Sequence, residues 1–197
     1  YVSLWLRDAG EQPGTDRWRE RYTRWMDWFS ASEVAAVGMG LVTLWRTESS
    51  EPIVRCEEVP QAIEQPAGAH LPSWIERGRW LARQDDAALL TAALRCTDGV
   101  VRVRHDLRED RAAGAGWLTE LSQLRQSHGM RWELEVDDAV AAVVASCDGN
   151  TPLAIPVAVL ASSLGRGPGE VATALLPVVR ELVQRGFLEP SATGSAA

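Results

Sequence analysis

The last third of the chain constrains the fold most, because residues typical of helix caps and turns there separate segments with helical apolar spacing. A helix is predicted over residues 138–147, with Asp137 or Asp138 as its N-cap. Its inward residues would be Val140, Val143, Val144 and Cys147. Asp148-Gly149 predicts the turn that ends it. A short helix over residues 155–164 and a turn at residues 165–167 follow.

A long helix is predicted after that turn, beginning at Pro168, a residue that suits the first helical position. Its apolar face would consist of Val171, Leu175, Val178 or Val179, Leu182 and Val183. Pro177 predicts a kink or a break, and Gly186 predicts the C-terminal end. Phe187 and Leu188 then predict a short strand. These predicted elements follow the order of a winged helix-turn-helix domain, which is helix, short helix, turn, long helix and strand.

Arg166, Arg180 and Arg185 are the candidate partner-binding residues of this winged-helix-like region. Three acidic residues of the same stretch oppose them, namely Glu170, Glu181 and Glu189. A balanced charge gives no electrostatic signature of nucleic-acid binding. A contact with a protein is therefore favoured over one with DNA, although contact with RNA stays open.

The N-terminal sixty residues predict two helices followed by a hairpin. Residues 2–9 have helical apolar spacing, although alternation at Val2, Leu4 and Leu6 also permits a strand. Residues 16–30, with Asp16 as N-cap, predict a helix with an aromatic stripe, which more often packs in a core than binds a ligand. Nearly continuous apolar residues at 34–45 predict a buried strand, paired with a second strand over residues 52–59 after a polar turn at 47–51.

The middle of the chain predicts a linker and a mixture of helices and strands. Pro60, Pro66, Gly68 and Pro72 mark a linker. Helices are predicted over residues 74–84, 86–94 and, after a break at 114–116, from Trp117 toward Gly129. Alternation predicts strands over residues 100–107 and 130–136. The fold class is therefore α+β, with domains over residues 1–60 and 67–190 and a disordered tail over residues 191–197.

Composition excludes several classes of function. The net charge is −7 and the calculated pI is about 5.0, which opposes nonspecific binding of nucleic acid by the whole surface. All basic residues other than histidine are arginine, so these residues contain no Schiff-base or Walker lysine. Cys56, Cys96 and Cys147 are far apart, which fits a reduced, cytoplasmic protein without a zinc site. No apolar run is long enough for a membrane span.

Three segments together resemble a known family. The run from Tyr1 to Gly10 (YVSLWLRDAG), the helix over residues 18–29 and the apolar run VAAVGMGLVTLWR at 34–46 are similar to the end of the catalytic domain of some actinobacterial class I S-adenosylmethionine-dependent methyltransferases. These are distant relatives of release-factor glutamine methyltransferases. Cys147-Asp148-Gly149 and the run LVQRGFL at 182–188 resemble their winged-helix-like extension. The resemblance implies that residues 1–60 are the last helix and final strands of a Rossmann-like sheet.

The cofactor motifs of that family do not occur in this sequence. Its members hold the cofactor with a Gly-rich loop and an acidic residue, and position the substrate with an Asn-Pro-Pro-Tyr loop; Gly38-Met39-Gly40 lacks the third glycine and the helix that such a loop needs. No catalytic, cofactor-binding or metal residue is therefore assigned.

The resemblance and the start at Tyr1 lead us to expect the C-terminal region of a longer methyltransferase that binds S-adenosylmethionine elsewhere. This region would serve substrate recognition or structural completion. Its partners would be the missing N-terminal catalytic part, a protein or RNA substrate, and a second copy through an exposed sheet edge. The alternative is a noncatalytic winged-helix module that binds a protein or nucleic acid.

Overall fold

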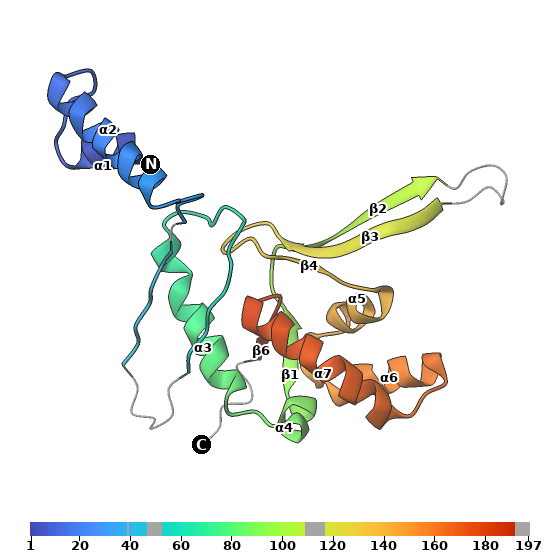
Figure 1. Cartoon of the computed structure of the whole chain (residues 1–197). Coiled ribbons are helices and arrows are strands. Elements are labelled where there is room, and N and C mark those ends of the chain that lie inside the picture. The colour runs from blue at the N-terminus through green and yellow to red at the C-terminus, as the bar shows by residue number, and fades with distance from the viewer. Residues whose placement is uncertain (39, 47–52, 109–116, 192–197) are drawn as a thin grey trace. The chain divides into compact units, whose positions relative to one another are not determined.

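The computed structural model describes residues 1–38, 40–46, 53–108 and 117–191 (Figure 1). The chain divides into two compact units, Tyr1–Pro52 and Ile53–Ala197. The described residues form seven α-helices, one short 3-10 helix and two small antiparallel sheets, which confirms the α+β class. The predicted turn at 47–51, the break at 114–116 and the tail at 192–197 lie outside the described residues.

The smaller unit contains two helices, α1 (Val2–Asp8) and α2 (Asp16–Ala31). Thr15, rather than Asp16, caps α2, because its Oγ1 accepts a hydrogen bond from the Trp18 N–H at 3.2 Å. Glu11 lies in the turn and is only 8% exposed, and its Oε1 pairs with Arg17 Nε at 3.1 Å and Arg21 Nη1 at 2.7 Å. This carboxylate ties the turn to the first part of α2.

The aromatic stripe of α2 is not a core in the described residues, so the core interpretation is wrong for this unit. Trp25 contacts Trp5 of α1 at a ring-centroid distance of 5.5 Å, and Phe29 lies 5.7 Å from Trp25. No residue of α2 is buried, however, and Trp25 and Trp28 are 40% and 53% exposed. The reason is that α1 has only seven residues. Its surface is too small to cover the aromatic face of α2, which is sixteen residues long.

The apolar runs at 34–45 and 53–59 contain no strand in the described residues, so the predicted hairpin is wrong here. Leu41, Val42 and Leu44 are 67%, 82% and 90% exposed. Described residues 35–38, 40–46 and 53–60 make no backbone hydrogen bond to other described residues. A strand exists only when a neighbouring strand satisfies its N–H and C=O groups, and none of the described segments does so.

The larger unit contains two three-stranded antiparallel sheets. In the first, β1 (Ala93–Cys96) lies between β5 (Asp148–Pro152) and β6 (Leu188–Pro190). In the second, β3 (Trp117–Gln126) lies between β2 (Val100–Arg108) and β4 (Glu133–Glu135). The β2–β3 hairpin extends away from the helices (Figure 1).

The helix predicted from Trp117 toward Gly129 is wrong, because this segment is strand β3. Its register with β2 runs from Val100 opposite Gln126 to Arg108 opposite Trp117, with one irregularity after His105. Ser122 and Leu124, two residues apart, are both buried, as expected on one face of a strand. The nine residue pairs with β2 therefore determine that this segment is a strand, although its apolar residues are also spaced as in a helix.

Two helices of the larger unit precede β1 and end earlier than the sequence indicates. They are α3 (Leu71–Leu81) and α4 (Asp86–Thr91), with a 3-10 turn at Ala67–Ala69 before them. The prediction of helix through Leu94 is wrong, because Leu94 belongs to β1 and is 1% exposed. Its pairing with Pro190 across the sheet requires extended backbone.

The last three helices are those predicted: α5 (Asp138–Ala145), α6 (Ala154–Leu164) and α7 (Pro168–Arg185). Asp137 is the cap of α5, and Gly186 ends α7 in the left-handed conformation at φ 81°. Pro177 breaks no helix, because α7 continues through it. The core of the unit includes Leu89, Leu94, Leu153, Val179, Leu182, Val183, Phe187 and Leu188.

Candidate functional site

The three candidate arginines lie on α7 and in the turn before it, and they do not form one patch. Arg166 precedes the helix and Arg185 is its last residue, so at 1.5 Å per residue they are separated by roughly 28 Å. Arg166 Nη1 lies 3.5 Å from Glu170 Oε1, and Arg180 Nη2 donates to Asp86 Oδ1 at 2.8 Å. Arg185 pairs with Glu181 one turn earlier. Each cation is thus matched by a carboxylate, which leaves no net positive surface along the helix.

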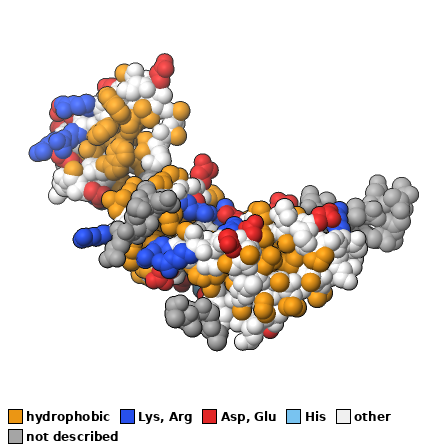
Figure 2. All heavy atoms as spheres, turned by 90° about the horizontal axis from the view of Figure 1, so that it is seen from below, with side chains coloured by type: hydrophobic (Ala, Val, Ile, Leu, Met, Phe, Trp, Pro, Cys, Tyr) orange, Lys and Arg blue, Asp and Glu red, His pale blue; other side chains and the backbone are white. Residues whose placement is uncertain are grey.

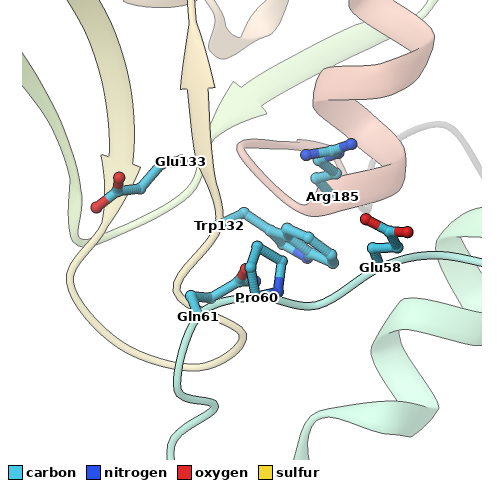
Figure 3. Close-up of a pocket in the computed structure, with 6 residues that line it drawn as sticks. All are labelled: Glu58, Pro60, Gln61, Trp132, Glu133 and Arg185. Atoms are coloured by element: carbon cyan, nitrogen blue, oxygen red, sulfur yellow. The ribbon is translucent and has the colours of Figure 1, made fainter. Parts of the chain in front are cut away.

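Arg185 nevertheless lies at a cavity. Its guanidinium carbon is 4.6 Å from the centre of the Trp132 ring, a cation–π contact, and Gln126 Nε2 donates to its carbonyl oxygen at 2.9 Å. The cavity has a volume of about 510 Å³ and lies between the C-terminal end of α7, the start of β4 with the residue before it, and the segment at 58–61 (Figure 3). Its lining residues are Glu58, Pro60, Gln61, Trp132, Glu133 and Arg185.

Three of the six residues that line this cavity are charged. Two carboxylates and one arginine line it, and the arginine is already paired with Glu181 and stacked on Trp132. None of its lining residues is a histidine, cysteine, serine or threonine, so the lining offers no activated nucleophile with a base beside it. The sequence indicated Arg185 as a candidate partner-binding residue and gave no sign of its contact with Trp132.

The described cysteine and histidine side chains are not arranged for catalysis or metal binding either. Burial raises the pKa of the Cys147 thiol to about 12, which keeps this thiol protonated and unreactive. The His128 ring lies 3.2 Å from Ser127 Oγ, but both are exposed and adjacent in sequence. No group of three or more histidine, cysteine, aspartate or glutamate side chains in the described part of the chain is arranged to hold a metal ion.

A second concave surface, which sequence reasoning missed, lies between α5 and α6. A groove of about 240 Å³ is lined by Ala142, Val143, Ser146, Thr151, Ile155, Pro156, Val159, Leu160 and Ser163. Ile155 and Val159 are one turn apart on α6 and are 54% and 65% exposed. The available signal was the stretch of residues 149–165, which contains no charged residue. A surface helix normally carries charge on its outer face.

None of the described helices is both long enough and apolar enough to pass through a lipid bilayer. No curated protein matches this sequence. One family model does match, over residues 72–190, and its description is domain of unknown function DUF7782. The matched residues include both sheets and helices α4 to α7, and therefore the groove and three of the six residues that line the cavity. Because this match covers more than half of the chain, the chain belongs to the DUF7782 family.

Proposed function

We propose that this chain is the noncatalytic C-terminal region of a class I S-adenosylmethionine-dependent methyltransferase. Its first part would complete the catalytic sheet, and its larger unit would serve recognition of a substrate or protein partner. The resemblance of the first 46 residues and of the C-terminal end to such enzymes suggests this assignment. One structural observation supports it most strongly.

That observation is the exposure of described apolar residues in the run at 34–46. Val42 and Leu44 are 82% and 90% exposed, and residues 40–46 make no backbone hydrogen bond to another described residue. Each such side chain would gain roughly 1.5–3 kcal/mol from full burial, and each unpaired N–H and C=O would gain a partner. Alternating Leu, Val and Thr residues with strong β propensity are suited to addition to an existing sheet. A Rossmann-like sheet with unpaired edge groups would provide that position.

The arrangement of the larger unit supports a winged-helix-like interpretation of its C-terminal half. Helices α5, α6 and α7 and strand β6 follow each other in the expected order. Asp148 and Gly149, predicted as a turn, instead begin strand β5, which pairs with β1. The central strand of their sheet is β1, which comes from upstream in the sequence. Gln184 Nε2 donates to the Trp74 carbonyl at 3.4 Å, so α3 covers the C-terminal part of α7. A face covered in this way is not open to a DNA groove.

Gly38 and Gly40 are the glycines that a cofactor loop would need, and their surroundings do not favour such a loop. Both lie in the apolar run at 34–46, and a Cβ placed at either would meet no atom within 4 Å. Neither glycine is therefore needed for a close backbone approach in the described residues, and neither opens a helix that would place its N-terminus on a ligand. We expect titration calorimetry of this chain with S-adenosylmethionine to show no heat of binding. Micromolar binding would contradict the assignment.

The reading frame upstream of Tyr1 tests the proposal directly. A Gly-rich loop and an Asn-Pro-Pro-Tyr motif encoded there would support it, and their absence would refute it. Hydrogen exchange then tests the role of the apolar run at 34–46. Amides at 40–46 should exchange freely in this chain and be protected in the longer protein, whereas free exchange in both would exclude sheet completion.

The second candidate function is a noncatalytic winged-helix module that binds a partner independently of a methyltransferase. The pairing of Arg166, Arg180 and Arg185 with carboxylates favours a protein over nucleic acid as that partner. Salt-dependent binding of duplex DNA or RNA, together with an upstream frame that lacks methyltransferase motifs, would establish this module as a nucleic-acid binder instead.

A further inference from the structure

The cavity at the C-terminal end of α7 contains a buried hydrogen-bond donor that lacks an acceptor. Trp132 lines this cavity and is only 2% exposed, and its indole Nε1 is buried without an acceptor among the described residues. In Figure 3 the Trp132 ring lies between Arg185 on one side and Pro60 on the other. A buried N–H without an acceptor costs free energy, so a ligand that supplies an acceptor would be favoured here.

One wall of the cavity is fixed in place, whereas its rim is not. Gln61 Nε2 donates to the Met130 carbonyl at 3.1 Å. The Gly129 N–H donates to Glu64 Oε2 at 2.6 Å, and the Glu64 N–H donates to the Gly129 carbonyl at 2.9 Å. Residues 58–60, in contrast, make no backbone hydrogen bond to another described residue. The wall is therefore held from Gln61 onward, and the rim can move enough to admit a ligand atom to the indole N–H.

The arginine that lines the cavity carries no surplus charge. Arg185 pairs with Glu181, Glu181 Oε2 lies 3.3 Å from Arg55 Nη2, and Arg55 also pairs with Glu57. Two cations and two carboxylates thus alternate along this network and balance each other. Figure 2 shows arginine and acidic side chains near one another on the larger unit as well. Arg185 is therefore already neutralised and gives the cavity no preference for an anion.

The two carboxylates that line the cavity are additional to this balanced network. Glu58 forms no hydrogen bond or ion pair with any residue in the described part of the chain. Glu133 Oε1 has a long ion pair, 4.0 Å from Arg125 Nη1. The lining therefore carries an excess of negative charge, and this excess favours a cationic ligand.

The openness of the cavity favours a side chain of a larger partner over a small metabolite. Glu58, Pro60 and Glu133 are all exposed. Sites for small molecules are usually mostly apolar and bury most of the surface of their ligand. A basic residue of a protein carries both groups that this cavity lacks. Its side chain is a cation for Glu58, and its backbone has a carbonyl oxygen for the Trp132 N–H.

We propose that this cavity binds an arginine or lysine residue of a partner protein. The cationic group pairs with Glu58, and a neighbouring backbone carbonyl accepts a hydrogen bond from Trp132 Nε1. Glu133, on the opposite side of Trp132 in Figure 3, adds electrostatic attraction. The site gives the larger unit the recognition role of the proposed function, on which the inference rests, and it specifies the chemistry of the partner.

Titration of the whole chain, labelled with nitrogen-15, with the acetylated and amidated tripeptide Gly-Arg-Gly tests the site by NMR. Trp132→Phe removes the indole N–H and so identifies the Trp132 signal among those of the nine tryptophans. We expect this signal to move to lower field, with a dissociation constant of roughly 1 mM or tighter. The same tripeptide with citrulline, the uncharged isostere of arginine, should bind about tenfold more weakly or worse.

Three variants distinguish this site from the rest of the surface, and circular dichroism checks that each one folds. Glu58→Gln should weaken binding of the arginine tripeptide by about tenfold, because it removes the charge that pairs with the cation. Trp132→Phe, followed through the Gln61 amide signal, should weaken binding by about threefold or more. Glu170→Gln is the matched control, because it removes an exposed charge roughly 22 Å along α7 from Arg185 and should leave binding unchanged.

Four outcomes would overturn the site. These are no signal change up to about 10 mM tripeptide, equal binding of the arginine and citrulline tripeptides, unchanged binding by Glu58→Gln, and equally tight binding of agmatine. Agmatine carries the guanidinium group without a carbonyl, so its equal binding would show that no carbonyl is recognised. The upstream reading frame decides the methyltransferase assignment separately. Tripeptide binding with a frame that lacks methyltransferase motifs would assign the site to the second candidate function.

Discussion

Phe187 provides the sharpest test of how the larger unit is held together. This side chain is 0% exposed and lies where α7 passes into β6. Its N–H donates to the Leu182 carbonyl at 2.8 Å, and its own carbonyl accepts from the Thr97 N–H at 3.0 Å. The backbone therefore links the end of α7 to the residue after β1, and the ring fills the core between them.

We expect Phe187→Ala to lower the free energy of unfolding of the larger unit by about 3–5 kcal/mol. This is the range for removing a fully buried aromatic ring, where lost transfer energy and the remaining cavity both contribute. Since small domains have a total stability of roughly 5–15 kcal/mol, this loss would be about a fifth of the total or more. Phe187→Leu, which keeps most of the apolar volume, should cost less than about half as much.

Urea unfolding followed by far-UV circular dichroism and tryptophan fluorescence measures this change, because Trp74, Trp80 and Trp132 all lie in the same unit. Leu164→Ala is the matched control, since Leu164 is 52% exposed and its truncation should change stability by no more than about 0.5 kcal/mol. A loss below about 1 kcal/mol for Phe187→Ala, or equal losses in both variants, would refute the core role of the ring.

Two further predictions concern the region around α5. Asp137 Oδ1 accepts from the Val140 N–H at 2.7 Å, so Asp137→Ala should cost about 1 kcal/mol in a urea titration. Asp138→Ala, which removes an exposed ion pair with Arg102 and a charge in the first turn but no cap, should cost less; the reverse order would contradict the cap assignment. Alkylation of the folded chain with iodoacetamide, mapped by mass spectrometry, should modify exposed Cys56 first and Cys147 last, since burial raises the pKa of the Cys147 thiol to about 12. Equal rates for the two would show that Cys147 is not held in the core.

The elements that sequence predicted well are those specified by neighbouring residues. Asp137 at the start of α5, Pro168 at the start of α7 and Gly186 at its end act within one helical turn. The strand at 100–107 was also recognised, because alternation of apolar and charged residues is a local pattern. The candidate arginines were correctly placed on the last helix and its approach, but their partners Asp86 and Glu181 follow from packing and side-chain geometry.

The sequence by itself determined the helices of the last third, their caps and their buried faces, because these depend on spacing and on backbone preferences within a few residues. Only the tertiary structure decided that the segment at 117–126 is a strand, since its identity depends on pairing with β2. It also decided that β1 lies between β5 and β6, and that Ile155 and Val159 remain uncovered. These outcomes depend on which distant segments meet, and an apolar residue alone does not specify the surface against which it packs.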